Sequence, residues 1–334
     1  MQAWCLKSRP TAMPTLNDFE LKSFDDAPLA DGQIRVANEF LSVDPYMRGR
    51  MNDVKSYVPP FALGEPMSGG AVGTVTESRA DGFAVGDKVM HMLGWRDEAV
   101  VPAAADAGPM GANKLPATGL PVQTFLHNLG LTGATAYFGL LRTAEAKAGD
   151  IVFVSAAGGA VGSAVVQIAK AKGMTVIGAA GGADKCAWVK ELGADAVIDY
   201  KAGSVLSQLA KAAPKGIDVY FDNVGGEHLD AAYAVARDNA RFAICGMIDA
   251  YNAGGKPLEL KFFIRTIPAR IRTQGFIFTD YAMHMGEFLA DAGAMIASGQ
   301  LKARETVMTG LESTPEAFLG LFSGANTGKM LVRL

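Results

Sequence analysis

The chain has 334 residues, enough for about two domains, and hydrophobic residues make up 49% of it, which suffices for ordinary cores. The formal net charge is −3 and the Lys and Arg residues are scattered, so we expect no nucleic-acid-binding surface. No stretch approaches the roughly 20 unbroken apolar residues of a membrane span, and the N-terminus lacks the apolar run of a signal peptide.

Residues 1 to about 122 are predicted to be rich in β-strands. Residues 32–43 alternate between apolar and polar side chains like a half-buried strand, and residues 69–78 form a second strand loosened by glycine. Residues 83–90 place Gly-Asp, a turn signal, before a third strand. Several short strands at this spacing predict a compact β-barrel.

From about Leu126 onward, predicted helices and strands alternate. After a helix over Thr135 to Arg142, we expect strands at 151–155, 174–178, 195–199, 217–222 and 241–245, with helices between them that include 184–192 and 204–213. Strands separated by helices indicate βαβ units and a doubly wound parallel sheet with right-handed crossovers, an α/β fold.

The last part of the chain continues this order and then changes. We expect a sixth strand at 271–278 and a long helix from Asp280 to Ala297. The tail after Gly299 is too short for a domain and ends in a strand-like segment at 329–334, so we expect it to return to the first domain. The predicted domains are therefore 1–122 and 123–298, with 299–334 as the returning tail.

A turn of small residues follows the first strand of the α/β part. The three glycine positions of the G-x-G-x-x-G fingerprint are occupied by Ala157, Gly159 and Gly162, so the first glycine is replaced. Gly159 would let the backbone approach a pyrophosphate, and Gly162 would let the helix lie close to the strand. The helix start, at Ala160 and Val161, would present free N–H groups and partial positive charge. The string alone also fits a tight strand–helix turn without a ligand, but its position between strand and helix favours a dinucleotide site.

The end of the second strand bears on the choice of coenzyme. NAD-binding units place Asp or Glu there, whereas residues 178–182 read Gly-Ala-Ala-Gly-Gly and carry no carboxylate. Lys185 could pair with a 2′-phosphate, which favours NADP(H), or could be a solvated lysine on a helix face. Asp184 leaves NAD open, because a displaced carboxylate could still bind a ribose.

Cysteine and histidine are scarce. Cys5, Cys186 and Cys245 lie far apart and the four histidines form no H-x-x-x-H pattern, so we expect no metal site. Each cysteine is interpreted as a packing or surface residue. Three thiols in a chain of this length fit a reducing compartment, so we expect the protein in the cytoplasm.

Five separated segments, in order, resemble the zinc-independent medium-chain dehydrogenases/reductases over the full length of the chain. The resemblance is to the branch that contains prostaglandin reductases, plant double-bond reductases and bacterial curcumin reductases. The matching segments are 42–51 (SVDPYMRGRM), 131–141 (LTGATAYFGLL), 221–227 (FDNVGGE), 245–248 (CGMI) with Tyr251 and Asn252, and 326–329 (NTGK).

The resemblance implies a GroES-like first domain, a Rossmann domain and NADPH as the coenzyme. It implies that Lys185 and Tyr200 hold the 2′-phosphate, that Asn223 and Asn326 contact the coenzyme, and that the backbone of Phe276–Phe278 lines the nicotinamide. Motif and resemblance together give these expected coenzyme-binding residues: Thr132, Ala157, Gly159, Ala160, Val161, Gly162, Lys185, Tyr200, Asn223, Cys245, Gly246, Met247, Phe276, Ile277, Phe278 and Asn326.

The zinc-dependent branch carries a Cys in its early loop and a Gly-His-Glu further on, where this chain has Val43–Tyr46 and Gly64-Glu65-Pro66. Without a Lewis acid, an activated alkene is an easier substrate than a simple alcohol. We therefore expect hydride transfer to the β-carbon of an α,β-unsaturated ketone or aldehyde. Tyr251, which matches the tyrosine near the substrate carbonyl, is the expected donor to the enolate oxygen, and Tyr46 is a second candidate.

Other interpretations stay open. A quinone reductase or a non-catalytic NADPH-binding protein would fit the same scaffold. Tyr251 could be a packed loop residue, Tyr46 could fix a turn, Tyr200 could cover an apolar edge, and Asn223 could cap the following helix. A homodimer joined through an exposed final strand near 271–278 is also expected, because an unpaired strand edge invites a partner.

Overall fold

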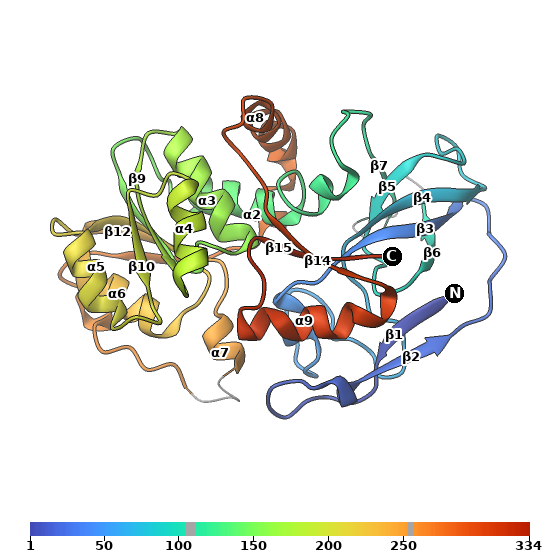
Figure 1. Cartoon of the computed structure of the whole chain (residues 1–334), viewed down its shortest axis with the longest axis horizontal. Coiled ribbons are helices and arrows are strands. Elements are labelled where there is room, and N and C mark those ends of the chain that lie inside the picture. The colour runs from blue at the N-terminus through green and yellow to red at the C-terminus, as the bar shows by residue number, and fades with distance from the viewer. Residues whose placement is uncertain (104–107, 109–110, 253–256) are drawn as a thin grey trace. The chain divides into compact units, whose positions relative to one another are not determined.

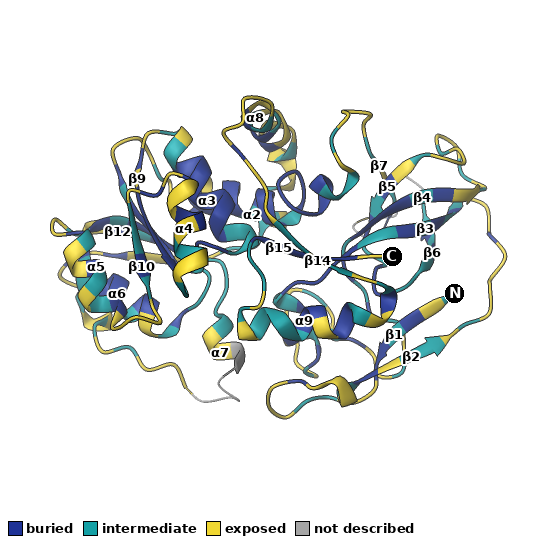
Figure 2. Ribbon diagram, viewed as in Figure 1, coloured by how far each residue is buried: buried dark blue, intermediate teal, exposed yellow. Residues whose placement is uncertain are grey.

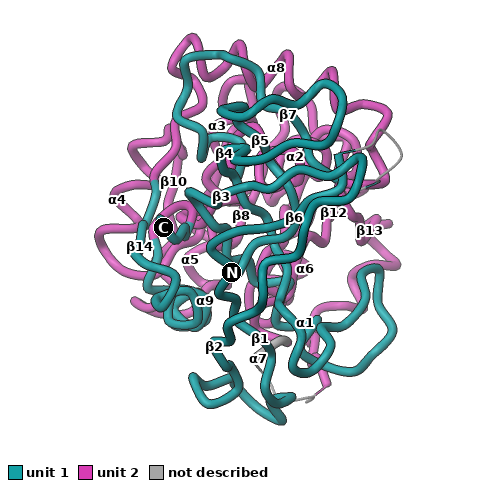
Figure 3. The backbone as a smooth tube through the Cα atoms, turned by 90° about the vertical axis from the view of Figure 1, so that its right-hand side faces the viewer, with its two compact units in different colours: residues 1–126, 305–326, 330–334 teal, residues 127–304, 327–329 magenta. Residues whose placement is uncertain are grey.

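The computed structural model describes residues 1–103, 108, 111–252 and 257–334, without the side chains of Tyr251 and Asn252. The chain forms two compact units, coloured separately in Figure 3. Unit 1 comprises Met1–Leu126, Glu305–Asn326 and Met330–Leu334, and unit 2 comprises His127–Arg304 and Thr327–Lys329. The domain boundaries expected near residues 122 and 298 stay predictions. Within the described residues, none of the helices is both long enough and apolar enough to cross a membrane.

Unit 1 is mostly β-structure (Figure 1). Its strands are β1 (Gln2–Leu6), β2 (Phe19–Ser23), β3 (Gln33–Ser42), β4 (Ala71–Ser78), β5 (Lys88–His91), β6 (Glu98–Pro102), β7 (Asn113–Lys114), β14 (Glu305–Thr309) and β15 (Lys329–Arg333). Its helices are α1 (Tyr46–Arg50) and α9 (Thr314–Ser323), with short 3-10 turns at Leu16–Asp18, Val122–Leu126 and Leu311–Ser313.

The main sheet of unit 1 has the order β14-β15-β3-β4-β5-β7, and β6 also pairs with β3. β15 runs antiparallel to β3, with Val332 opposite Leu41, so the last strand of the chain joins the main sheet of unit 1. An aromatic cluster fills the core beneath it, where Phe19 stacks on Trp95 and Phe318 meets both rings edge-on.

Unit 2 is built on a parallel sheet covered by helices. Its strands are β8 (Ile151–Val154), β9 (Thr175–Ala180), β10 (Ala196–Asp199), β11 (Ile217–Asp222), β12 (Ala236–Ile244) and β13 (Arg272–Gly275). Its helices are α2 (Leu131–Phe138), α3 (Ala160–Ala171), α4 (Ala183–Glu191), α5 (Val205–Ala212), α6 (Gly226–Val235), α7 (Ile248–Asn252) and α8 (Met285–Ala297), with irregular helical turns at Gly139–Thr143, Phe263–Thr266 and Phe278–His284.

The order of this sheet is β10-β9-β8-β11-β12-β13, and every pair is parallel, as predicted. β8 is a run of Ile, Val and Phe, which suits a central strand buried on both faces, and three of its four residues are buried. Helix α3, which contacts it, is drawn largely in the dark blue of buried residues in Figure 2. The strand order reverses between β8 and β11. In open parallel sheets, ligands bind beyond the carboxyl ends of the strands at such a reversal.

The predicted long helix from Asp280 was wrong in its first part. A 3-10 segment, Phe278–His284, precedes α8, and Tyr281 departs from helical geometry with φ −108° and ψ 20°. The Tyr281 ring stacks on Phe138 at 5.1 Å and its hydroxyl meets Thr143 at 2.8 Å. These tertiary contacts compete with the helix that local sequence favours.

Candidate coenzyme site

The small-residue turn after β8 folds back onto the neighbouring strand. The backbone N–H of Ala157 donates to the carbonyl of Ala179 in β9 at 2.8 Å, and Ala156 adopts a left-handed φ of 47°. A Cβ on Gly162 would lie 2.2 Å from the carbonyl oxygen of Ala156. Only glycine therefore fits at position 162, which is the role expected of it: α3 starts in contact with the turn.

The start of α3 presents unused donors. Ser163 makes the first helical bond, to Gly159, and in the described part of the chain the N–H groups of Ala160, Val161 and Gly162 meet no protein acceptor. Partial positive charge gathers at such an end, so the group that fits there is an anion such as a pyrophosphate.

Thr132, on the first turn of α2, contributes a second unsatisfied group. It is buried, and its hydroxyl has no hydrogen-bond partner among the described residues. A buried hydroxyl without a partner costs free energy, so its presence fits a site that a polar ligand completes.

The ends of β8 and β11 are joined by a buried polar network. The Asn223 side-chain amide donates to the carbonyl of Ser155 at 2.8 Å, and its backbone N–H donates to the Ser155 hydroxyl, also at 2.8 Å. Gly225, not Asn223, caps α6, so the alternative role of Asn223 as a helix cap was wrong. Because Asn223 does not cap α6, its amide oxygen remains suited to a ligand contact.

Asp222 organises this network, and the sequence interpretation missed it. Its Oδ1 accepts hydrogen bonds from Tyr220 at 2.7 Å and from the N–H groups of Val224 and Gly225 at 2.9 and 2.8 Å. Burial raises the pKa of Asp222, although these hydrogen bonds oppose the shift. The available signal was an acidic residue inside an apolar strand, since such a residue needs several donors.

The corner beyond β9 contains the residues expected to hold a 2′-phosphate. A Cβ on Gly181 would lie 2.5 Å from both Cζ and Oη of Tyr200, so the phenol ring of Tyr200 lies directly across the Gly181 backbone. Lys185 runs along Gly158, since a Cβ there would meet the Lys185 stem at 3.4 Å. Burial, followed by the charge of Lys201, lowers the pKa of Lys185.

A carboxylate does stand near this corner, on the neighbouring strand. Asp199, at the end of β10, accepts hydrogen bonds from the N–H groups of Gly182 at 3.0 Å and Lys201 at 2.9 Å. These two bonds lower the pKa of Asp199. Its carboxylate thus shapes the turn backbone. Sequence reasoning considered acidic residues only at the end of the second strand and at Asp184 just after it, and did not consider Asp199.

The loop after β12 returns toward the same network. The N–H groups of Cys245 and Gly246 donate to the carbonyl of Asp222 at 2.9 and 3.0 Å, and Met247 follows them. Burial, reinforced by Asp222, raises the pKa of the Cys245 thiol to about 12, so it is no thiolate nucleophile.

After β13, the Phe276 ring packs against Phe221 and over Gly139, where a Cβ would lie 2.3 Å from its Cζ. This contact directs the Phe276 side chain into the core. The next residue, Ile277, exchanges hydrogen bonds with Asp280: its N–H donates to the carboxylate at 3.2 Å, and its carbonyl accepts from the Asp280 N–H at 3.0 Å. Phe278 begins the 3-10 segment.

A short segment from the end of the chain completes the glycine turn. Gly328 forms a parallel bridge with Gly159, and its N–H donates to the carbonyl of Gly158 at 2.8 Å. Gly328 has a φ of +69°, and a Cβ there would lie 1.9 Å from the carbonyl oxygen of Arg304. Asn326 directly precedes this segment and belongs to unit 1.

The two expected catalytic tyrosines are described to different extents. Tyr251 lies in α7, and its side chain is outside the described residues. Tyr46 begins α1 in unit 1, and its buried hydroxyl lies near the Arg50 guanidinium without a well-formed hydrogen bond within the described ranges. Burial, followed by the charge of Asp44, raises the pKa of Tyr46 well above its usual value, so it remains a neutral donor.

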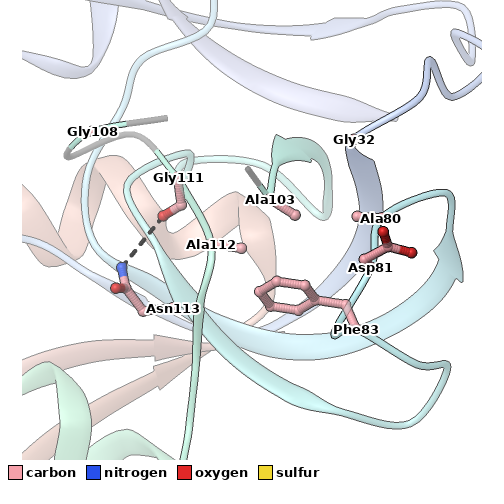
Figure 4. Close-up of a pocket in the computed structure, with 9 residues that line it drawn as sticks. All are labelled: Gly32, Ala80, Asp81, Phe83, Ala103, Gly108, Gly111, Ala112 and Asn113. Atoms are coloured by element: carbon pink, nitrogen blue, oxygen red, sulfur yellow. Dashed lines mark hydrogen bonds between the residues drawn. The ribbon is translucent and has the colours of Figure 1, made fainter. Parts of the chain in front are cut away.

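Two further features of the structure lie apart from the expected site. In the described part of the chain, no three His, Cys, Asp or Glu side chains gather as a metal site. A pocket of about 580 Å³ in unit 1 is lined by Asp81, Phe83 and Asn113, among others (Figure 4). Its described lining includes none of the expected site residues, and we assign it no role.

Comparison with known proteins places the chain in a family. Residues 2–107 match a family described as the N-terminal domain of oxidoreductases, and residues 160–291 match one described as zinc-binding dehydrogenases. The chain is 40% identical to the NADPH-dependent curcumin reductase of Escherichia coli, covering 99% of this chain and 96% of that protein. The chain belongs to the medium-chain dehydrogenase/reductase superfamily.

Other relatives specify the branch, that of the prostaglandin and curcumin reductases. Prostaglandin reductase 1 of Rattus norvegicus is 37% identical, over 99% of this chain and 98% of the relative. A crystal structure of CurA from Vibrio vulnificus in complex with NADPH has a TM-score of 0.93 and 41% identity, over 100% of this chain and 99% of that one.

Proposed function

We propose that the protein reduces the carbon–carbon double bond of α,β-unsaturated ketones or aldehydes with NADPH. The observation that carries this proposal is the near-full-length similarity to a curcumin reductase described as NADPH-dependent and to the CurA structure that contains NADPH. The described residues of unit 2 fit the coenzyme, because they offer unused N–H donors at α3, the Thr132 hydroxyl and a glycine-only approach at position 162.

The corner beyond β9 supports NADPH over NADH. The strand ends in Ala180 and continues with Gly181 and Gly182, so no carboxylate on it opposes a 2′-phosphate. Lys185 supplies a cation and Tyr200 a hydroxyl beside this position. Asp199 on the next strand is engaged by two backbone N–H groups, which makes it part of the turn rather than a ribose ligand.

When bound, the coenzyme supplies a hydride to the β-carbon of the enone. Negative charge then develops on the carbonyl oxygen, and a positioned donor lowers the barrier by about 3 kcal/mol. We assign this donor to Tyr251, in the helix that follows the Cys245–Met247 loop, and treat Tyr46 as a second candidate. Proton delivery to the enolate carbon by water completes the reduction.

The test is steady-state turnover with a matched panel. We expect NADPH oxidation with an aromatic enone, no turnover with the saturated ketone of the same skeleton, and a much lower kcat/KM with NADH. Quinones assayed without oxygen form a separate arm. Turnover of quinones with none of the enones would contradict the proposal, as would coenzyme binding without any turnover.

We also propose that two copies associate through β13. Within the described residues this strand pairs only with β12, and all four of its residues are exposed. Ile264 and Ile267, which precede it, are 69% and 74% exposed. Light scattering should give twice the 35.0 kDa of one chain, and Ile264→Asp with Ile267→Asp should lower that mass. Met283→Asp, at an exposed methionine outside this segment, is the control. A monomer mass for the unaltered protein would refute the association.

A further inference from the structure

The Tyr200 ring packs against a buried histidine, His228. The rings of Tyr200 and His228 meet edge-to-face, with centroids 5.4 Å apart and planes at 76°. His228 lies in the first turn of α6 and is only 6% exposed, whereas Tyr200 is 38% exposed. The buried imidazole of His228 therefore packs against the ring of a partly exposed tyrosine.

His228 in turn packs against aromatic residues in the core of the sheet. His228 lies parallel to Phe153 of β8, with ring centroids 6.5 Å apart, and Phe153 stacks on Tyr220 of β11 at 5.0 Å. Phe153 and Tyr220 are also register partners in the parallel sheet. The orientation of His228 is thus tied to two fully buried aromatic residues on neighbouring strands of the sheet.

Tyr200 has little room to adopt another orientation. Its hydroxyl oxygen and Cζ lie 2.5 Å from where a Cβ of Gly181 would be, and its backbone N–H donates to the carbonyl of Ala180 at 3.2 Å. Gly181 limits the ring on one side and His228 on another. A side chain held in this way loses less conformational entropy when its hydroxyl binds a ligand.

The histidine is costly to the fold itself. Its Nε2 is buried with no hydrogen-bond partner among the described residues, which is unfavourable for a polar atom. Burial lowers the pKa of His228 to about 4, although Glu227 and Asp249 oppose the shift, so the ring is neutral near pH 7. A leucine of similar size would avoid the unsatisfied nitrogen. The presence of histidine at position 228 therefore indicates a contribution to coenzyme binding, since stability alone does not favour histidine there.

We propose that His228 is a positioning residue, which holds the Tyr200 phenol across Gly181 so that its hydroxyl meets the 2′-phosphate of NADPH. This inference rests on the proposed function, because it needs the 2′-phosphate at Tyr200. His228 itself touches no coenzyme atom and acts only through the tyrosine ring.

The test compares His228→Leu with His228→Phe, each also in a Tyr200→Phe background, with Kd measured for NADPH and NADH. An aromatic pair contact corresponds to about a threefold to tenfold change in affinity. We expect His228→Leu to raise the Kd for NADPH by this factor, to change that for NADH less than about twofold, and to leave the melting temperature unchanged or higher. His228→Phe should restore NADPH binding, because it keeps the aromatic contact.

The double variant shows whether His228 acts through Tyr200. Once the tyrosine hydroxyl is absent, His228→Leu should have no further effect on NADPH binding. Three results would overturn this inference but not the proposed coenzyme, provided that the unaltered protein prefers NADPH. They are an equal loss of affinity for NADPH and NADH, additive effects in the double variant, and no effect of His228→Leu alone. A wild-type protein that binds NADPH and NADH equally would overturn the proposed coenzyme as well.

Discussion

The backbone N–H of Gly328 donates a hydrogen bond to the carbonyl oxygen of Gly158 at a distance of 2.8 Å. The two residues are 170 positions apart in the sequence, yet they lie side by side in unit 2. Because Gly158 is in the turn before α3, the shape of the expected pyrophosphate site depends on a segment near the C-terminus.

Gly328→Ala should therefore lower stability and weaken NADPH binding together. The left-handed φ and the Arg304 carbonyl at 1.9 Å both exclude a Cβ, so we expect a loss of about 3 kcal/mol in the free energy of unfolding. Gly299→Ala is the matched control, because Gly299 has a similar φ of +74° with no atom within 4 Å of its Cβ position. It should cost about 1 kcal/mol and leave the Kd unchanged. Equal effects of the two variants in urea unfolding and coenzyme titration would contradict this account.

Gly162→Ala tests the contact between α3 and the turn. Its Cβ would meet the Ala156 carbonyl oxygen at 2.2 Å, which displaces the helix start. We expect the Kd for NADPH to rise by more than about tenfold and the unfolding free energy to fall by about 2 kcal/mol. Gly293→Ala, on α8 with open space at its Cβ position, should instead stabilise the chain by up to about 1 kcal/mol. Unaltered NADPH binding by Gly162→Ala would be inconsistent with a pyrophosphate at this turn.

Tyr251→Phe should affect the chemical step more than binding. Loss of one donor to a developing oxyanion lowers kcat by about 100-fold, while the Kd for NADPH stays within about twofold. Tyr281→Phe is a control, because that hydroxyl contacts Thr143 and its ring stacks on Phe138. Single-turnover measurements with an enone separate the hydride step from product release. A wild-type rate for Tyr251→Phe would remove this residue from the mechanism.

Tyr46→Phe distinguishes a substrate contact from a packing role. The buried hydroxyl has no well-formed hydrogen bond within the described ranges and only a weak interaction with Arg50, so its removal should change the melting temperature little. If the hydroxyl meets substrate, kcat/KM for enones should fall by about tenfold despite that unchanged stability. A stable variant with full activity would show that Tyr46 only packs in unit 1.

The buried His91 predicts loss of stability in acid. Its Nε2 pairs with the Asn38 amide oxygen at 2.9 Å and its Nδ1 accepts from the Leu93 N–H at 3.1 Å, so the ring is held neutral. Burial lowers the pKa of His91 to about 3, from 6.5. Below pH 6.5 the unfolded chain binds a proton that the folded chain does not, so stability present above pH 6.5 is lost as the pH falls toward 3.

This share of the pH dependence amounts to at most about 1.4 kcal/mol per pH unit. Urea unfolding at a series of pH values should show it, and His91→Gln should reduce the slope between pH 6 and 4 by about that amount. An unchanged slope in the variant would mean that His91 does not drive the acid sensitivity.

Most of the α/β fold could be predicted from the sequence, because the residue patterns that indicate its strands, turns and helices are local. The run Ile151–Val154 followed by small residues and an apolar-faced helix leaves few alternatives to a βα unit. The sequence motif also predicted the role of Gly162, since a tight strand–helix turn needs a residue without a side chain. Helix α9 was not predicted, although Pro315 near its start and the left-handed Gly324 at its end are standard boundary signals.

Features that depend on distant residues were out of reach. Nothing local shows that Tyr200 lies across Gly181, or that Asp199 on the neighbouring strand holds Gly182. The 3-10 segment before α8 likewise follows from the Tyr281 contact with Phe138. The alternative to a coenzyme contact for Asn223 was a local role as a helix cap, whereas its side chain bonds to Ser155, 68 positions earlier.

The order in which a ribosome makes the chain gives the Gly328 contact a further meaning. Gly328, which forms backbone contacts with Gly158 and Gly159, is added after more than nine-tenths of the protein has been synthesised. A growing polypeptide can pair β8 with β9 early, but its glycine turn lacks this bridge until residue 328 is added. We therefore expect full coenzyme affinity only at the end of translation, and weak NADPH binding by a product truncated a few residues before Gly328.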